Sequence, residues 1–283
     1  MQRPARAGKG EMVFSGPELA FAFFTAFVIL SVYGIVKTMS MQGLSLTPEK
    51  DKKDKKGGKD EKEEEEKKGV CLLIAHPDDE TMFFVPTILA LRRDKIDVRV
   101  LCMSNGSHDG LGKVREKELL KACAKLGVQE DHVTIVDDKR LQDGPNNNWE
   151  VSAISEHLLP FIDKHNIGAL VTFDNYGISG HPNHIALHTA VAELRENKAL
   201  DPAKVRVHRL QSVALFRKFS GPMCYLERRF LFVGLGKKTQ TVFALDVALV
   251  YGCLWAHKSQ AVWYRSLFVL FSRYTYMNVL KEI

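Results

Sequence analysis

The sequence predicts an α/β fold, and two patterns carry that prediction. From Gly69 onward, short aliphatic runs alternate with longer segments of helical spacing, which is typical of βαβ units in a mostly parallel sheet. The chain has 283 residues, 45% of them hydrophobic, which is enough for one domain with a sizeable core. We therefore expect a Rossmann-like, mostly parallel sheet with helices on both faces. An uncharged run near the N-terminus adds one transmembrane helix before it.

Each predicted element follows from its local pattern. Aliphatic runs that predict buried strands occupy 70–74, 98–103, 133–136 and 169–173. Segments with apolar residues at helical spacing occupy 80–93, 113–126, 151–165 and 183–197. Beyond Leu210 the alternation loosens, and we predict strands at 212–216 and 230–233 and an apolar helix at 247–270.

The N-terminal part divides into a tail at 1–18, an uncharged run at 19–36 and a charged segment at 37–68. At 1.5 Å per residue, a helix over 19–36 just spans roughly 30 Å of hydrocarbon. The alternative is a cleaved signal peptide, but the run exceeds the usual core of about 7–15 residues and no small-x-small site precedes Lys37. We expect a membrane anchor, followed by a flexible linker and a catalytic domain at 69–283.

Charge and cysteine content indicate the side of the membrane. Lysines are more frequent just after the predicted span than basic residues are before it, which favours a cytoplasmic catalytic domain. The five cysteines are widely spaced in apolar segments, as expected of free core residues in a reducing compartment. The formal net charge of +6 suits a membrane surface or a phosphorylated substrate. No basic patch interleaved with aromatics predicts a nucleic-acid partner, and nothing identifies a protein partner.

The first chemical signal is His76-Pro77-Asp78-Asp79-Glu80, directly after the strand predicted at 70–74. In open α/β sheets, ligands collect beyond the carboxyl ends of the strands. One imidazole and three carboxylates are costly to hold together unless a cation or a catalytic role compensates them. The motif therefore predicts an active site that holds a metal ion.

A second signal follows the strand predicted at 169–173, where His181 and His184 lie three residues apart at a helix start and share one helix face. Alone, such a pair is usually accidental, but with the first loop it indicates a metal site. Two histidines and one carboxylate match a catalytic zinc site with a position left for water. A further carboxylate can accept the proton of that water, which predicts metal-assisted hydrolysis, most naturally of an amide. The residues alone do not divide these roles between Asp78 and Asp79.

These motifs carry a resemblance. Ala75-His-Pro-Asp-Asp-Glu80 and Ser179-Gly-His-Pro-Asn-His184 resemble the zinc-dependent sugar de-N-acetylase family. Arg115-x-Lys-Glu-Leu119, His257-Lys-Ser-Gln260 and Phe271-Ser-Arg-Tyr274 are similar to members of that family that act on N-acetylglucosaminyl-phosphatidylinositol. The resemblance extends over roughly 70–278.

The resemblance implies a role for each residue. His76, Asp79 and His184 would bind Zn²⁺ or another divalent metal, Asp78 would be the base, and His181 the electrostatic or acid partner. Further assignments concern Arg115 and Asp143 as substrate contacts and Asp174 as a residue that orients a histidine. Their alternatives are a surface salt bridge, a turn former and a loop cap, in that order.

Three other features have simpler interpretations. Glu80 is expected to stabilise the first turn of a helix, and His257 to be a satisfied core histidine. The apolar stretch 262–270 is interpreted as core packing, with membrane contact as the alternative.

The resemblance also implies an activity and a location. The enzyme would remove acetyl from N-acetylglucosaminyl-phosphatidylinositol, the second step of glycosylphosphatidylinositol-anchor synthesis. It would be a single-pass protein of the endoplasmic reticulum membrane with its catalytic domain in the cytoplasm. The alternatives are a tethered de-N-acetylase of a soluble N-acetylglucosamine conjugate and a non-catalytic scaffold on the same fold.

Overall fold

A seven-stranded sheet forms the centre of the computed structural model, which describes residues 68–144, 146–230 and 238–283 and the single residues 25, 33 and 46. The strands are β1 (Gly69–Ile74), β2 (Val98–Cys102), β3 (Val133–Ile135), β4 (Ile167–Phe173), β5 (Arg206–Leu210), β6 (Thr239–Phe243) and β7 (Met277–Glu282). Within the described ranges their order is β3-β2-β1-β4-β5-β7-β6. The first five strands run parallel, whereas β7 is antiparallel to both of its neighbours. The predicted mostly parallel sheet is confirmed.

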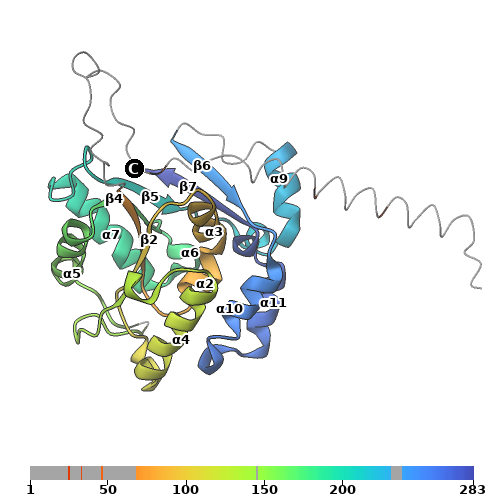
Figure 1. The fold of residues 1–283 in the computed structure, drawn as a ribbon, viewed down its shortest axis with the longest axis horizontal. Helices are drawn as coiled ribbons and strands as arrows, with labels where there is room; N and C mark the ends of the chain where they lie inside the picture. Colours follow the sequence, from red (N-terminus) through yellow and green to blue (C-terminus); the bar gives the residue numbers. More distant parts are fainter. Residues whose placement is uncertain (1–24, 26–32, 34–45, 47–67, 145, 231–237) are drawn as a thin grey trace, which may run out of the picture.

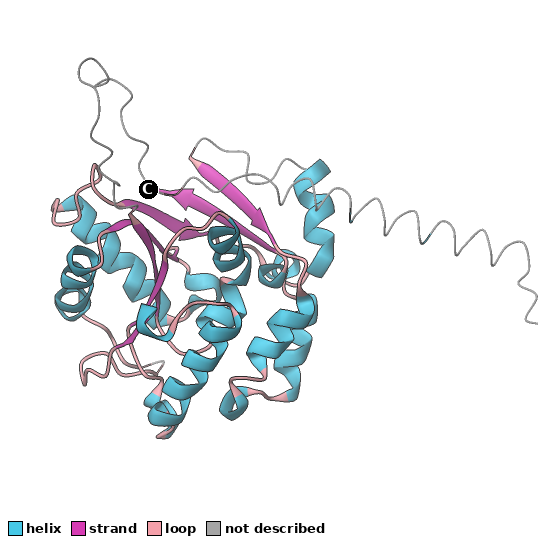
Figure 2. Cartoon of the chain, in the orientation of Figure 1, coloured by secondary structure: helices cyan, strands magenta, loops and turns pink. Residues whose placement is uncertain are grey.

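Helices cover both faces of this sheet (Figures 1 and 2). They are α2 (Asp79–Phe83), α3 (Val85–Arg93), α4 (Gly112–Lys125), α5 (Val151–Lys164), α6 (Gly177–Gly180), α7 (Pro182–Glu196), α8 (Leu215–Lys218), α9 (Cys224–Phe230), α10 (Val247–Leu254) and α11 (Trp263–Phe271). Helices α5 and α7 lie on one side of the sheet, and α3, α4 and α10 on the other (Figure 1). Because both faces are covered, the central strands β1 and β4 are buried along their whole lengths, which explains their unbroken apolar sequences.

The chain starts the sheet in the middle. From β1 it runs outward through β2 and β3, then returns to place β4 on the other side of β1. The chain therefore leaves the carboxyl ends of the neighbouring strands β1 and β4 in opposite directions, and doubly wound folds bind ligands at such a point. All five cysteines are free and buried, as the sequence predicts.

Two predicted helices are each divided in the structure. The helix predicted at 80–93 is α2 followed by α3, because Phe84 leaves helical geometry and α3 begins at Val85 with Pro86 in its first turn. Pro at this position is favourable since the first helical N–H groups need no partner within the helix. The helix predicted at 247–270 is α10 and α11, separated by a short 3-10 helix at Lys258–Gln260.

The prediction of a strand at 212–216 is wrong. Ser212 lies in a loop, and Leu215 begins the short helix α8 instead. Phe230, the first residue of the other predicted strand, ends α9, and 231–233 lie outside the described residues. Strands β5, β6 and β7, which extend the sheet beyond β4, were not predicted from the sequence.

The predicted span at 19–36 lies outside the described residues except for Thr25 and Tyr33. Among the residues that the structure describes, no helix is long and apolar enough to cross a membrane. Leu46, within the segment interpreted as a linker, is buried in the core, and its carbonyl oxygen lies 3.1 Å from Nε2 of His208.

Candidate active site

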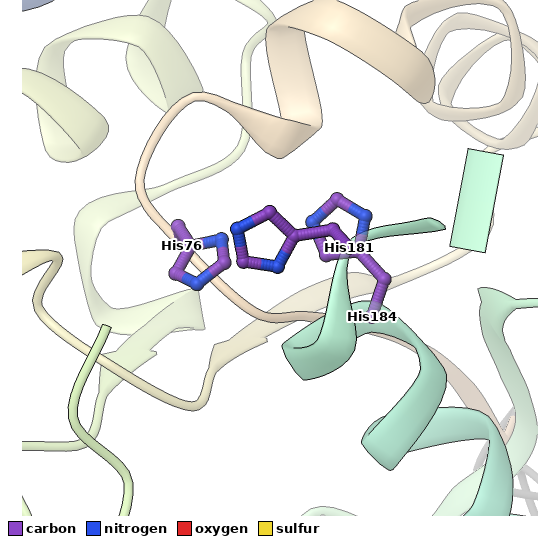
Figure 3. A group of neighbouring side chains, drawn as sticks. All are labelled: His76, His181 and His184. Atoms are coloured by element: carbon purple, nitrogen blue, oxygen red, sulfur yellow. The ribbon is translucent and has the colours of Figure 1, made fainter. Parts of the chain in front are cut away.

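The candidate site lies between the carboxyl ends of β1 and β4, where the strand order reverses. His76 follows β1, whereas His181 and His184 lie at the start of α7, after β4. The three imidazoles stand side by side (Figure 3), and one ring nitrogen from each lies within 4.8 Å of the others. The structure thus joins the two loops that the sequence predicts to share a site.

Asp79 is the carboxylate that the imidazoles of His76 and His184 approach. Its Oδ2 accepts hydrogen bonds from the backbone N–H groups of Ala75 and His76, at 3.0 and 2.9 Å. Its Oδ1 lies 3.1 Å from Nε2 of His184, and its Oδ2 lies 3.9 Å from Nδ1 of His76. Burial raises the pKa of Asp79, but His184 and His76 outweigh that effect and hold the pKa well below its usual range. Asp79 is therefore a fixed, buried anion.

Hydrogen bonds indicate which ring nitrogen of His184 and of His76 carries the proton and which carries the lone pair. Nδ1 of His184 lies 3.0 Å from the carbonyl oxygen of Gly177 and must donate to it, so a neutral ring leaves Nε2 as the acceptor. Nε2 of His76 lies 3.0 Å from Oδ1 of Asn183 and 3.2 Å from Oδ1 of Asp143. Both are acceptors, so we assign the proton of His76 to Nε2 and its lone pair to Nδ1.

The donor set formed in this way fits a divalent cation. Nε2 of His184 is buried, and no hydrogen bond satisfies it within the part of the chain that the structure describes. Burial lowers the pKa of His184, but the charge of Asp79 outweighs burial and raises the pKa above its usual range, so this position attracts positive charge. Nitrogens of His76 and His184 and a carboxylate oxygen of Asp79 are the ligand types of catalytic zinc sites.

His181 faces the same space, and the position of its proton follows from its hydrogen bond to the backbone. Its Nδ1 accepts a hydrogen bond from the backbone N–H of Asn183 at 3.3 Å, as the N-cap of α7. The proton of the neutral ring therefore sits on Nε2, which makes that atom a donor. Burial, together with His76 and His184, lowers the pKa of His181 to about 4, so the ring is neutral at pH 7. In this tautomer Nε2–H is a hydrogen-bond donor, although His181 also belongs to the cluster of three histidines whose ring nitrogens lie close enough to hold a metal ion.

Asp78 lies beside the cluster in a strained conformation. Its φ of 122° is rare for any residue except glycine, and such strain is typical of functional sites. Its backbone N–H donates to Oε2 of Glu80 at 3.0 Å. Its Oδ2 accepts a hydrogen bond from Nη1 of Arg265 at 2.5 Å. Sequence reasoning missed the role of Arg265. This residue lies 187 residues after Asp78, and no sequence motif connects the two.

A cavity of about 410 Å³ opens over these residues. Its charged and imidazole-bearing lining consists of His76, Asp78, Asp79, Asp109, Arg115, Asp143, His181, His184 and Arg265. Ser179, Ser259 and Gln260 add polar groups, and Met82, Phe83, Leu111, Val262 and Tyr264 supply apolar wall. All the metal and catalytic residues predicted from the sequence therefore face one space, together with both predicted substrate contacts.

Arg115 and Asp143 form an ion pair within this wall. Nη1 of Arg115 donates to Oδ2 of Asp143 at 3.0 Å and to the carbonyl oxygen of Gly106 at 2.9 Å. Nη2 donates to the carbonyl oxygen of Pro77 at 2.9 Å. The pair is mostly buried, so it differs from the surface salt bridge considered as the alternative for Arg115. It ties the loops after β1 and β2 together, and the predicted substrate contacts remain a prediction.

Asp174 holds the loop after β4, and the hydrogen bonds found for it go to no histidine. Its Oδ1 accepts from the backbone N–H groups of Tyr176 and Gly177, both at 3.1 Å, and from the Ser212 hydroxyl at 2.6 Å. Since the carbonyl of Gly177 accepts from His184, Asp174 acts on that histidine only through the Gly177 peptide. The loop-cap interpretation describes its contacts better than direct orientation of a histidine.

Glu80 and His257 form a second buried pair, at 2.6 Å between Oε1 and Nε2. Burial lowers the pKa of His257, but the charge of Glu80 outweighs burial and raises the pKa. Glu80 also accepts from the Asp78 backbone, so it does more than stabilise a helix turn. Gln260, in the same motif as His257, donates to the carbonyl oxygen of Pro77 at 3.1 Å. The His257-Lys-Ser-Gln260 motif was the sequence signal for this support.

The fold and site together define a class of protein: an α/β fold with a cluster of histidines, compatible with a divalent metal, at the switch point of its sheet. The family model "PIG-L: GlcNAc-PI de-N-acetylase" matches residues 71–194. The "Probable N-acetylglucosaminyl-phosphatidylinositol de-N-acetylase" of Schizosaccharomyces pombe is 39% identical over 226 residues, 76% of this chain and 87% of the relative. The Bos taurus protein of that name, without "Probable", is 39% identical over 212 residues, 74% of this chain and 81% of the relative. The chain belongs to the GlcNAc-PI de-N-acetylase family.

Solved structures share this architecture at low sequence identity. A triple mutant of a deacetylase from the teicoplanin biosynthetic pathway aligns with a TM-score of 0.53 and 14% identity, over 76% of this chain and 98% of its own. The N,N'-diacetylchitobiose deacetylase from Pyrococcus horikoshii aligns with a TM-score of 0.53 and 16% identity, over 77% and 84%. At these identities the likeness bears on the fold alone.

Proposed function

We propose that this protein hydrolyses the acetamide of N-acetylglucosaminyl-phosphatidylinositol to give glucosaminyl-phosphatidylinositol and acetate, the second step of glycosylphosphatidylinositol-anchor synthesis. One observation carries the proposal: relatives of that name align over most of both chains at 39% identity. The cavity supports it, because imidazoles and carboxylates suited to amide hydrolysis line one wall.

His76, Asp79 and His184 would hold the metal, for which we propose Zn²⁺. When bound, such an ion polarises an amide carbonyl and lowers the pKa of water toward about 7. The backbone N–H groups of Ala75 and His76 keep the Asp79 carboxylate in place. The Gly177 carbonyl does the same for the ring of His184, which also stacks on Phe173 with ring centroids 3.9 Å apart. These supports favour a preformed site.

Asp78 is the proposed base. Its carboxylate accepts the proton of the attacking water and returns a proton to the leaving nitrogen, so that acetate and a free amine result. Arg265 holds one of its oxygens and thereby sets the orientation of the other. His181 presents a neutral Nε2–H, which stabilises the carbonyl oxygen as that oxygen gains negative charge.

We further propose a single-pass anchor at 19–36 in the endoplasmic reticulum membrane, with the catalytic domain on the cytoplasmic side. The uncharged run and the lysines that follow it support this orientation. An anchor would confine the enzyme to the plane that contains a phosphatidylinositol glycolipid.

The test uses the purified full chain with two substrates, N-acetylglucosaminyl-phosphatidylinositol in vesicles and water-soluble N-acetylglucosaminyl-inositol. We expect release of acetate from the lipid, loss of activity after chelation, and recovery on addition of Zn²⁺. Equal turnover of both substrates would favour the soluble-conjugate alternative. No acetate from either substrate, with a full complement of metal, would favour a non-catalytic scaffold.

A further inference from the structure

Helix α11 presents its apolar stripe to solvent. Trp263, Tyr264, Leu267, Leu270 and Phe271 are all exposed, and their spacing of one, four, seven and eight residues places them along one side of a helix. In a globular protein such a stripe normally faces the core. The exposed fraction of Trp263 is 77%, which is unusual for the largest apolar side chain. The predicted core packing of 262–270 is therefore wrong for most of the stretch, although Val269 is buried.

A second exposed apolar group lies beside this stripe, on α8 and the turn after it. Phe216 is 78% exposed, and the Phe219 ring contacts the Phe268 ring of α11 with centroids 6.1 Å apart. We call the two groups together the apolar face: Leu215, Phe216, Phe219, Met223, Val262, Trp263, Tyr264, Leu267, Leu270 and Phe271. These are ten of the sixteen exposed large hydrophobic residues in the described ranges, so exposure is concentrated here.

The two chain segments that carry the apolar face contain basic residues and no acidic ones. The sequence contains no Asp or Glu at 211–226 or at 255–276, whereas both segments contain Lys and Arg. Lys258 is exposed at the start of the turn before α11. Nζ of Lys218 lies 5.9 Å from the ring centroids of both Phe219 and Phe268, so its stem covers apolar surface while its charge stays near the rim. The arginines of these segments pair with Glu227 and Asp78, so the positive charge that an anionic surface would meet comes from Lys218 and Lys258.

The apolar face adjoins the mouth of the active-site cavity. Val262 and Tyr264 belong to both, and Arg265 of the same helix binds the Asp78 carboxylate. Leu215 and Lys218 line a neighbouring hollow that shares Ser179 with the cavity. Helix α11 packs beside α10 at the edge of the molecule (Figure 1). A surface that covers α11 would therefore lie next to the opening through which substrate enters.

We propose that the apolar face docks on a phospholipid bilayer that contains anionic lipid, and so presents the cavity to substrate headgroups. The inference rests on the proposed function, because a phosphatidylinositol substrate lies in such a bilayer. Trp and Tyr with basic neighbours are typical of the membrane interface, and an apolar helix face with basic residues is typical of interfacial helices. Trp263 and Tyr264 on α11, with Lys218 and Lys258 nearby, match the chemistry of an anionic bilayer surface.

The docking test uses the full chain in nanodiscs of phosphatidylcholine and phosphatidylinositol, with bromine on the acyl chains as a quencher of tryptophan emission. We expect quenching in the wild type and loss of most of it in Trp263→Phe, which removes the reporter but keeps apolar surface. If Trp263 is shielded from both brominated lipid and aqueous acrylamide, then protein covers the face, either residues 19–36 or a second copy, and the proposal is overturned.

The kinetic test compares Phe216→Ser/Leu267→Ser with Val114→Ser, which removes an exposed apolar side chain from α4, outside the apolar face. We expect the KM for lipid substrate in vesicles to rise about tenfold or more in the double variant only, because two apolar side chains that would become buried in the bilayer are replaced. Turnover of the soluble headgroup and the unfolding midpoint should match the wild type. An unchanged KM for lipid would overturn the docking proposal. Failure of the wild type on both substrates would overturn the proposed function, while the quenching result still decides docking.

Discussion

Nη1 of Arg265 lies 2.5 Å from Oδ2 of Asp78, so helix α11 holds the carboxylate that we propose as the base. The guanidinium is a charge-assisted donor to one oxygen of this group, which constrains the direction in which the other can accept a proton. This contact joins the last third of the chain to the loop after β1. It makes α11 part of the site, although no metal ligand lies on it.

The first prediction concerns this contact. Arg265→Gln should lower kcat about tenfold to a hundredfold, since a hydrogen bond to a charged group contributes about 1.5–3 kcal/mol. Arg265→Lys should recover part of that loss because it keeps the charge. Metal content, measured by mass spectrometry, should equal that of the wild type in both. Loss of metal in Arg265→Gln would contradict a role confined to the base.

The second prediction separates the adjacent carboxylates. Asp78→Asn should retain its metal and lose about 10²–10⁴-fold in kcat, the range for removal of a general base. Asp79→Asn should lose the metal itself, because its oxygens face His184 and His76. The comparison needs metal content and steady-state kinetics of both variants. Full activity in Asp78→Asn would remove the proposed base.

The third prediction uses two glycines of α6. Both have positive φ, so alanine at either position strains the backbone similarly. A Cβ on Gly177 would lie 2.7 Å from Cβ of His184, whereas a Cβ on Gly180 would meet nothing within 4 Å. Gly177→Ala should therefore weaken metal binding, measured by competition with a chelator, and Gly180→Ala should not. Equal effects of the two variants would show that strain, and not His184, is responsible.

The fourth prediction concerns pH and the buried Glu80–His257 pair. Since the folded-state pKa of His257 is raised above its usual value, the pair stabilises the fold fully below about pH 6.5, and this stabilisation fades as pH rises through the folded pKa. Glu80→Gln should lower the free energy of unfolding by about 3–5 kcal/mol at pH 6 and by less at pH 9. Urea unfolding with chelator present measures both. A difference that grows with pH would contradict the assignment.

The core of the fold was predictable because it depends on local patterns. Strands β1 and β4 are apolar runs buried along their whole lengths because both faces of the sheet are covered there. Strands β2 and β3 contain Arg99 and Thr134 but keep enough aliphatic residues to be recognised. The far edge was not predictable in the same way. Residues 206–210, 239–243 and 277–282 mix polar and apolar side chains, and they form strands through pairing with one another and with β4.

In the site, too, residues within local motifs were predictable and residues placed by long-range packing were not. His76, Asp79, His181 and His184 lie in two short motifs, so their proximity followed from the rule that ligands gather at the carboxyl ends of strands. Arg265 had no such motif, and its contact depends on how α11 packs. Glu80 was underestimated for a related reason, because its partner His257 lies 177 residues away.

The positive φ of Asp78 has a consequence for protein engineering. A non-glycine residue in such a conformation costs on the order of 1–3 kcal/mol, so this enzyme gives up stability at the very residue proposed to move the proton. Asp78→Gly should therefore melt at a higher temperature than Asp78→Ala, although neither would hydrolyse substrate. Both variants lose the contact with Arg265, so the difference between their melting temperatures measures the backbone cost alone.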